Sequence, residues 1–98
     1  MPAYFIVNTR ITDVSKRKQY DEYIARVVPI VESHGGKYII RSERITALSD
    51  SWKPDRVIVI QFASKEQIFK WLSSPEYKEI ANLRIESVAS EAVIVEED

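Results

Sequence analysis

The stretch from residue 56 to residue 72, RVIVIQFASKEQIFKWL, decides the fold of this chain. Its first part, Arg56 to Phe62, is a run of β-branched and aromatic residues without a helix breaker, which predicts a strand. Ser64 and Gln67 follow at the spacing of a capping box, the motif that starts many helices. A strand therefore leads directly into an amphipathic helix, whose buried stripe is expected to comprise Ile68, Phe69, Trp71 and Leu72.

The same unit occurs at the beginning of the chain. Residues 3 to 11, AYFIVNTRI, predict a strand, and residues 12 to 15 supply N-cap side chains for a helix from about Lys16 to Ser33. Pro29 lies inside this helix and removes one backbone hydrogen bond, so we expect a kink or an early end there. The pair Gly35–Gly36 is expected to end the helix. Its apolar face comprises Tyr20, Tyr23, Ile24, Val27 and Val31.

Two further strands and a short helix complete the predicted order. The strands are Lys37 to Ile45 and Glu91 to Glu96, and the helix runs from Pro75 to about Leu83 with Ser74 as its N-cap. The resulting order, βαββαβ, is the pattern of the ferredoxin-like fold. We therefore expect one α+β domain over residues 1–98, with a four-stranded antiparallel sheet and the helices on one face.

The predicted strands are apolar on both faces, as Tyr4–Val7 and Val57–Ile60 show. Two helices can cover only one face of the sheet, and monomers rarely leave a large apolar face in water. We therefore expect a homodimer in which two sheets pack face to face. The alternative is that Ile and Val are present only because they form strands well.

Composition excludes several classes of protein. Fourteen basic and fifteen acidic residues give a net charge of -1, and the third strand offers no stacking aromatics, so no nucleic-acid partner is expected. The chain has no Cys, one His and no phosphate-binding glycine motif, so neither a metal nor a cofactor is expected. Its apolar runs are too short for a membrane span and it begins without a secretory signal, which favours a cytoplasmic protein.

Several motifs make the chain resemble the DUF1330 family, a group of small bacterial proteins of uncharacterised function. They include Gly35–Gly36, Trp52-x-Pro54-x-Arg56-Val57 and Ser74-Pro75-Glu76-Tyr77, and the resemblance covers essentially all 98 residues. The family is similar to the dimeric α+β barrel superfamily, in which two ferredoxin-like sheets form one barrel. That superfamily includes cofactor-free quinol monooxygenases, haem-degrading monooxygenases and muconolactone isomerases, so the resemblance implies fold and dimer rather than one chemistry.

Six residues are candidates for a functional site. Arg41, His34 and Arg84 are candidate catalytic groups, and Arg41, Trp52, Trp71, Tyr77 and Arg84 are candidate ligand contacts. Each has a structural alternative: His34 as a helix cap, Arg41 as the partner of Glu43, and Trp52 as a plug at the barrel end or the dimer seam. Tyr77 and Arg84 are seven residues apart, so one helix face could present both to a small carboxylate or enol.

These residues predict a small-molecule site between the sheet and the helices. Such a site could support cofactor-free monooxygenase or isomerase chemistry; the alternative is a non-catalytic ligand-binding or structural homodimer. A cavity of roughly 300 Å³ or more at this place favours the first interpretation, and a closed core favours the second. In either case Arg41 is expected to be shielded from water.

Overall fold

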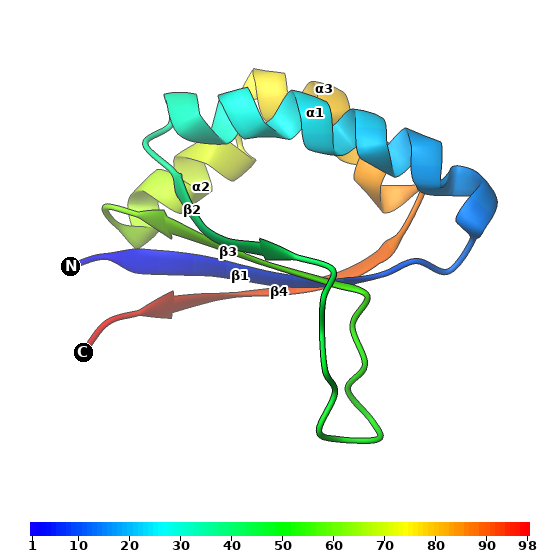
Figure 1. Cartoon of the computed structure of the whole chain (residues 1–98). Coiled ribbons are helices and arrows are strands. Elements are labelled where there is room, and N and C mark those ends of the chain that lie inside the picture. The colour runs from blue at the N-terminus through cyan, green and yellow to red at the C-terminus, as the bar shows by residue number, and fades with distance from the viewer.

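The computed structural model describes all residues from 1 to 98 and has the predicted ferredoxin-like order (Figure 1). The sheet has the strand order β2-β3-β1-β4, and every neighbouring pair is antiparallel. None of the helices is long and apolar enough to cross a membrane. The elements are β1 (Ala3–Arg10), a 3₁₀ turn η1 (Val14–Lys16), α1 (Arg17–Ser33), β2 (Lys37–Ser42), β3 (Arg56–Phe62), α2 (Lys65–Leu72), α3 (Pro75–Ile85) and β4 (Ala89–Glu96).

The helix starts follow from the capping residues that the sequence contains. The Ser64 side chain accepts a hydrogen bond from the Gln67 backbone N–H, and the Ser74 side chain accepts one from that of Tyr77. The capping box is only half formed, because the Gln67 side chain donates instead to the His34 carbonyl at 2.9 Å. This bond ties the start of α2 to the end of α1.

Two glycines make the turn between α1 and β2 possible. Gly35 has a φ of 83°, which an L side chain rarely adopts. A Cβ on Gly36 would overlap Val31 Cγ1 and would lie 2.8 Å from Phe62 Cζ. The turn therefore needs the first glycine for its backbone conformation and the second for close packing.

The early end that we expected at Pro29 does not occur, since α1 continues through it to Ser33. Proline removes the hydrogen bond to the carbonyl of Ala25, and both residues lie on the exposed side of the helix. Water can therefore hydrate the freed carbonyl. The apolar face on the other side still holds Tyr20, Tyr23, Val27 and Val31 against the core.

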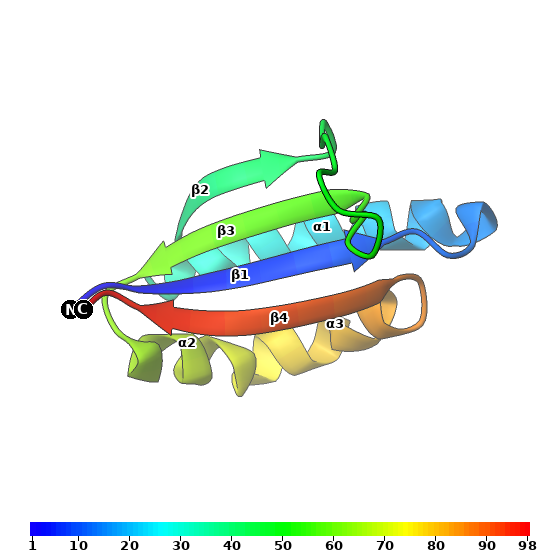
Figure 2. The same cartoon turned by 90° about the horizontal axis from the view of Figure 1, so that it is seen from below.

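All three helices lie on one side of the sheet (Figures 1 and 2). The hydrophobic core consists of side chains from the sheet and from these helices. The side chains of β1 alternate between the two faces, with Ala3, Val7 and Thr9 buried on the helix side. Trp71 of α2 and Ile80 of α3 complete this core, each 1% exposed. Phe69 was predicted to be buried, but it is 54% exposed on the outer side of α2.

The opposite face of the sheet carries no helix (Figure 1). We refer to it as the open face. It is apolar, as predicted, because Ile6 pairs with Val59 and Val93 in the ladder, and Tyr4 pairs with Val95. Val93 is 57% and Ile40 47% exposed in the single chain.

The connection between β2 and β3 is the most unusual part of the molecule. The second strand ends at Ser42 rather than at the predicted Ile45. Residues 44 to 54 then form a long excursion without helix or strand, which we call the arm. It projects from the sheet on the side of the open face (Figure 1).

Candidate ligand cavity

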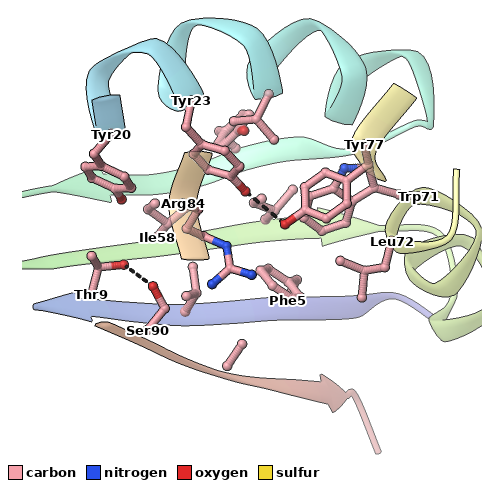
Figure 3. A pocket seen from close by; sticks show the side chains of 15 residues that line it. Phe5, Thr9, Tyr20, Tyr23, Ile58, Trp71, Leu72, Tyr77, Arg84 and Ser90 are labelled. Atoms are coloured by element: carbon pink, nitrogen blue, oxygen red, sulfur yellow. Dashed lines mark hydrogen bonds between the residues drawn. The ribbon is translucent and has the colours of Figure 1, made fainter. Parts of the chain in front are cut away.

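A cavity of about 330 Å³ lies between the sheet and the helices. Its size meets the lower limit for a small-molecule site. Twelve of its fifteen lining residues are hydrophobic, and Figure 3 shows how their side chains converge from strands and helices. The lining comprises Phe5, Val7, Thr9, Tyr20, Tyr23, Val27, Tyr38, Ile58, Ile60, Trp71, Leu72, Tyr77, Arg84, Ser90 and Ala92.

Aromatic rings fix the shape of one end of the cavity. The Trp71 ring meets those of Phe5 and Tyr77 edge to face, each with centroids 5.0 Å apart. It also stacks on Phe62 at 5.6 Å. Because the Trp71 N–H is buried and donates no hydrogen bond, this residue shapes the cavity by packing rather than by a polar contact.

Two tyrosine hydroxyls meet above the cavity. The Tyr23 and Tyr77 oxygens are 3.0 Å apart and share one hydrogen bond (Figure 3). Burial, reinforced by the neighbouring Tyr77, raises the pKa of Tyr23 above its ordinary value. Burial also raises the pKa of Tyr38 to about 12. The hydroxyls of Tyr23 and Tyr38 therefore remain protonated at neutral pH and can donate hydrogen bonds.

Arg84 of α3 supplies the only charge in the lining. Figure 3 shows its guanidinium below the two tyrosine hydroxyls, and Phe5 and Ile58 belong to the same lining. Burial alone lowers the pKa of Arg84, but Tyr77 and Tyr23 more than offset this, so its pKa lies above the ordinary value. It forms none of the ion pairs of the chain, each of which involves another basic residue: Arg17, Arg26, Arg56 or Lys65.

The opposite end of the cavity carries two aliphatic hydroxyls. Thr9 of β1 and Ser90 of β4 lie across the ladder from each other, with their oxygens 3.2 Å apart. The lining contains no Asp, Glu or His, and no three potential metal ligands gather anywhere in the chain. The cavity can thus bind an anion and donate hydrogen bonds, but it has no general base that is deprotonated at neutral pH.

The structure brings three of the predicted site residues together: Trp71, Tyr77 and Arg84 all line the cavity. Trp52 lies on the arm, outside the cavity and 62% exposed. His34 is also outside it. Its Nδ1 lies 2.9 Å from the Ile30 carbonyl at the end of α1, which agrees with the structural alternative of a helix cap.

The predicted shielding of Arg41 is wrong for the single chain, where this residue is exposed. A bulge between Tyr38 and Ile40 shifts the register and places Arg41 opposite Ile58 on the edge strand. Its guanidinium lies over the Tyr38 ring, 4.7 Å from the centroid. The structural alternative, an ion pair between Arg41 and Glu43, does not form, because Glu43 binds Arg17 and Arg56 instead.

Glu43 instead joins the base of the arm to the helix layer. It accepts two hydrogen bonds from Arg17 of α1, at 2.7 and 2.8 Å, and one from Arg56 at 3.2 Å. The Arg17 hydrogen bonds are the main cause that lowers the pKa of Glu43 to about 2.

Sequence reasoning missed most of the polar side chains that line the cavity together with Arg84. Tyr20 and Tyr23 were assigned to the apolar face of α1 on their ring character alone. Two of the five residues on that face are tyrosines, and their hydroxyls were the available signal. Tyr38, Thr9 and Ser90 lie on three strands, and only the sheet register brings them to the same face.

Comparison with known proteins agrees with this architecture. The family model described as "Domain of unknown function (DUF1330)" matches residues 2–98. The chain belongs to the DUF1330 family. Comparison of the DUF1330 chain with curated proteins finds no match.

Several solved structures share the fold at low sequence identity. A dimeric ferredoxin-like protein of unknown function from Jannaschia sp. CCS1 is 12% identical, with a TM-score of 0.82 over 99% of this chain and 100% of that one. A protein of unknown function from Rhodopseudomonas palustris is 18% identical, with a TM-score of 0.81 over 99% and 82%. SnoaB, a cofactor-independent oxygenase from Streptomyces nogalater, is 11% identical, with a TM-score of 0.73 over 99% and 93%.

Proposed function

We propose that this DUF1330 protein binds a small planar organic anion, a carboxylate or the ionised form of an enol, in the cavity between its sheet and its helices. The observation that carries the proposal is the Arg84 guanidinium, which lines an apolar cavity without a carboxylate partner. A half-buried cation in such surroundings is stabilised by an anion.

The lining also defines the shape of the ligand. Its volume of about 330 Å³ suits a molecule with one or two rings, and the flat surfaces of Phe5, Trp71 and Tyr77 favour a planar body. Arg84 would bind the anionic oxygens. The Tyr23 and Tyr77 pair has one O–H that its mutual hydrogen bond leaves free, and this group can donate to the same anion.

Matched ligand pairs test this proposal. Isothermal titration with benzoate and benzamide, and with cinnamate and cinnamamide, compares an anion with a neutral molecule of the same shape. We expect the carboxylates to bind at least about tenfold more tightly, a difference of about 1.4 kcal/mol. The variant Arg84→Met should abolish this preference, whereas Arg26→Met, which removes a half-exposed arginine on the outside of α1, should preserve it. Equal binding of acids and amides by the wild-type protein would contradict the proposal.

Oxidation of the bound anion by dioxygen is the second candidate function. The likeness of fold to SnoaB favours it, as does a cavity that can stabilise an ionised enol. The cavity lacks a base, so the substrate must ionise readily by itself. The reaction would convert a ring CH₂ of the substrate to C=O. One atom of O₂ would enter the product and the other would leave as water, and the substrate would supply all four electrons that reduce O₂. Oxygen uptake with acidic enols, absent in Arg84→Met, would support this activity; binding without uptake would leave the protein as a non-catalytic binder.

The open face supports the predicted homodimer. Its apolar residues, such as Ile6, Val59 and Val93, lack a cover within the chain, and the Jannaschia protein with the same fold is described as dimeric. Two copies that pack their open faces together would form the closed barrel expected from the resemblance. Sedimentation at micromolar concentration should give about twice the chain mass of 11.4 kDa. A monomer would contradict this part of the proposal.

A further inference from the structure

The arm is fixed at its base and free along its length. Glu43 at one end binds Arg17 and Arg56, while Asp55 at the other end accepts a hydrogen bond from the Ile11 N–H at 2.7 Å. The Asp55 N–H donates to the Thr9 carbonyl at 2.8 Å. Residues 45 to 54 form no hydrogen bond with any other part of the chain. A rigid base therefore holds an otherwise uncovered segment in a defined direction.

The uncovered segment carries large apolar side chains. Leu48 is 98% exposed, more than any other hydrophobic residue in the chain, and Trp52 is 62% exposed. Tryptophan in particular is enriched where proteins bury it against a partner. Burial of these two side chains against another protein surface would remove apolar area from water and so favour binding.

The arm is long enough to extend past a second sheet. Thirteen residues from Glu43 to Asp55 make two limbs of about six, which reach about 20 Å when extended. The molecule measures 35 × 32 × 16 Å, and its sheet and helix layer account for only about 10–13 Å in one direction. The 32 Å extent therefore agrees with an arm that projects about 20 Å from the sheet. Two packed sheets are only about 10 Å apart.

We propose that the arm embraces a second copy of this chain: Leu48 and Trp52 pack along an edge of the partner sheet. This inference rests on the proposed face-to-face dimer and adds to it. The arm leaves the sheet on the side of the open face, so it points toward that partner (Figure 1). Its length exceeds the spacing between the sheets, so it runs past an edge of the partner rather than ending inside the interface.

Photo-crosslinking tests the contact directly. Benzoylphenylalanine at position 48 replaces a fully exposed side chain, and Val14, 81% exposed on the helix side of the molecule, is the matched control position. A mixture of unlabelled and ¹⁵N-labelled chains distinguishes crosslinks between copies from those within one chain. We expect mixed-isotope dimers from position 48 that map to a sheet edge of the partner, and none from position 14.

The variant Trp52→Ala gives an independent measurement. Its dimer dissociation constant should rise at least tenfold by sedimentation, whereas Phe69→Ala, which removes a similarly exposed aromatic ring from the helix layer, should leave it unchanged. A dimer with crosslinks only within single chains and an unaffected Trp52→Ala variant would overturn the role of the arm and leave the sheet-to-sheet dimer standing. A wild-type monomer would overturn both.

Discussion

The two faces of the sheet carry the same kinds of residue, yet the chain covers only one of them with helices. Alternate residues of β1 make the difference: Val7 and Thr9 are buried under the helices, while their neighbours Ile6 and Asn8 point to the uncovered side. Packing on the covered face also leaves space, because a cavity lies between the sheet and the helices. One face thus lacks a second protein surface, and the other has room for a small molecule.

The largest expected effect is on the free energy of unfolding, and it distinguishes the buried side of α2 from its exposed side. Trp71→Ala removes a ring that is 1% exposed and packs on three other aromatic rings, so it should lower the free energy of unfolding by about 3–5 kcal/mol. Phe69→Ala, on the outside of the same helix, should change it by no more than about 0.5 kcal/mol. Urea unfolding measures both. Similar losses for the two variants would mean that α2 packs differently.

A charge placed on the open face should act on association instead of folding. Val93→Asp would bury an unpaired carboxylate between the two sheets, so the dimer should dissociate at least a hundredfold more readily, about 3 kcal/mol. Val14→Asp introduces the same charge at an exposed site on the helix side and should have no such effect. Sedimentation equilibrium over a range of concentrations gives both constants. An unchanged dimer in Val93→Asp would place the interface elsewhere.

The smallest expected effect on stability comes from Glu43, which joins the base of the arm to the helix layer. Arg17 lowers the pKa of Glu43 from 4.5 to about 2, so the folded state favours its ionised form. The resulting stabilisation is fully present above about pH 4.5 and is lost as the pH falls toward about 2. Because the Glu43 side chain is 39% exposed, Glu43→Gln should cost only about 1 kcal/mol or less at neutral pH.

Unfolding of wild type and Glu43→Gln at intervals from pH 7 to pH 3 measures this dependence. The difference between them should narrow below about pH 4.5. Glu22→Gln is the matched control, since its ion pair with Arg26 is longer, at 3.6 Å, and more exposed. A gap that widens on acidification would contradict the assigned role of Arg17.

Sequence patterns predicted the elements well where local chemistry determines them. The strand from Arg56 to Phe62, the caps at Ser64 and Ser74, and the end of α1 before the Gly35–Gly36 pair all appear as expected. The continuous apolar runs of the strands also identified both apolar faces of the sheet. These features depend on residues within one helical turn or one strand, so the local sequence displays them directly.

Features set by contacts between distant segments could not be predicted in this way. The bulge at Tyr38–Ile40 follows from pairing with β3, and it moves Arg41 away from the surroundings that alternation assigned to it. The Tyr23 and Tyr77 hydroxyls meet across 54 positions of sequence. Pro29 was judged from its effect on an isolated helix, although its exposed position makes the lost hydrogen bond inexpensive.

The shared hydrogen bond between Tyr23 and Tyr77 has a consequence for selectivity. Either oxygen can be the donor of this bond, so the O–H that remains free can belong to Tyr23 or to Tyr77, whose oxygens are 3.0 Å apart. A bound ligand can accept a hydrogen bond from either hydroxyl, depending on where its acceptor atom lies, without any movement of the backbone. In the proposed complex, the cavity therefore selects for negative charge and planarity but tolerates variation in the position of the ligand's second oxygen, which suits a series of related compounds rather than a single one.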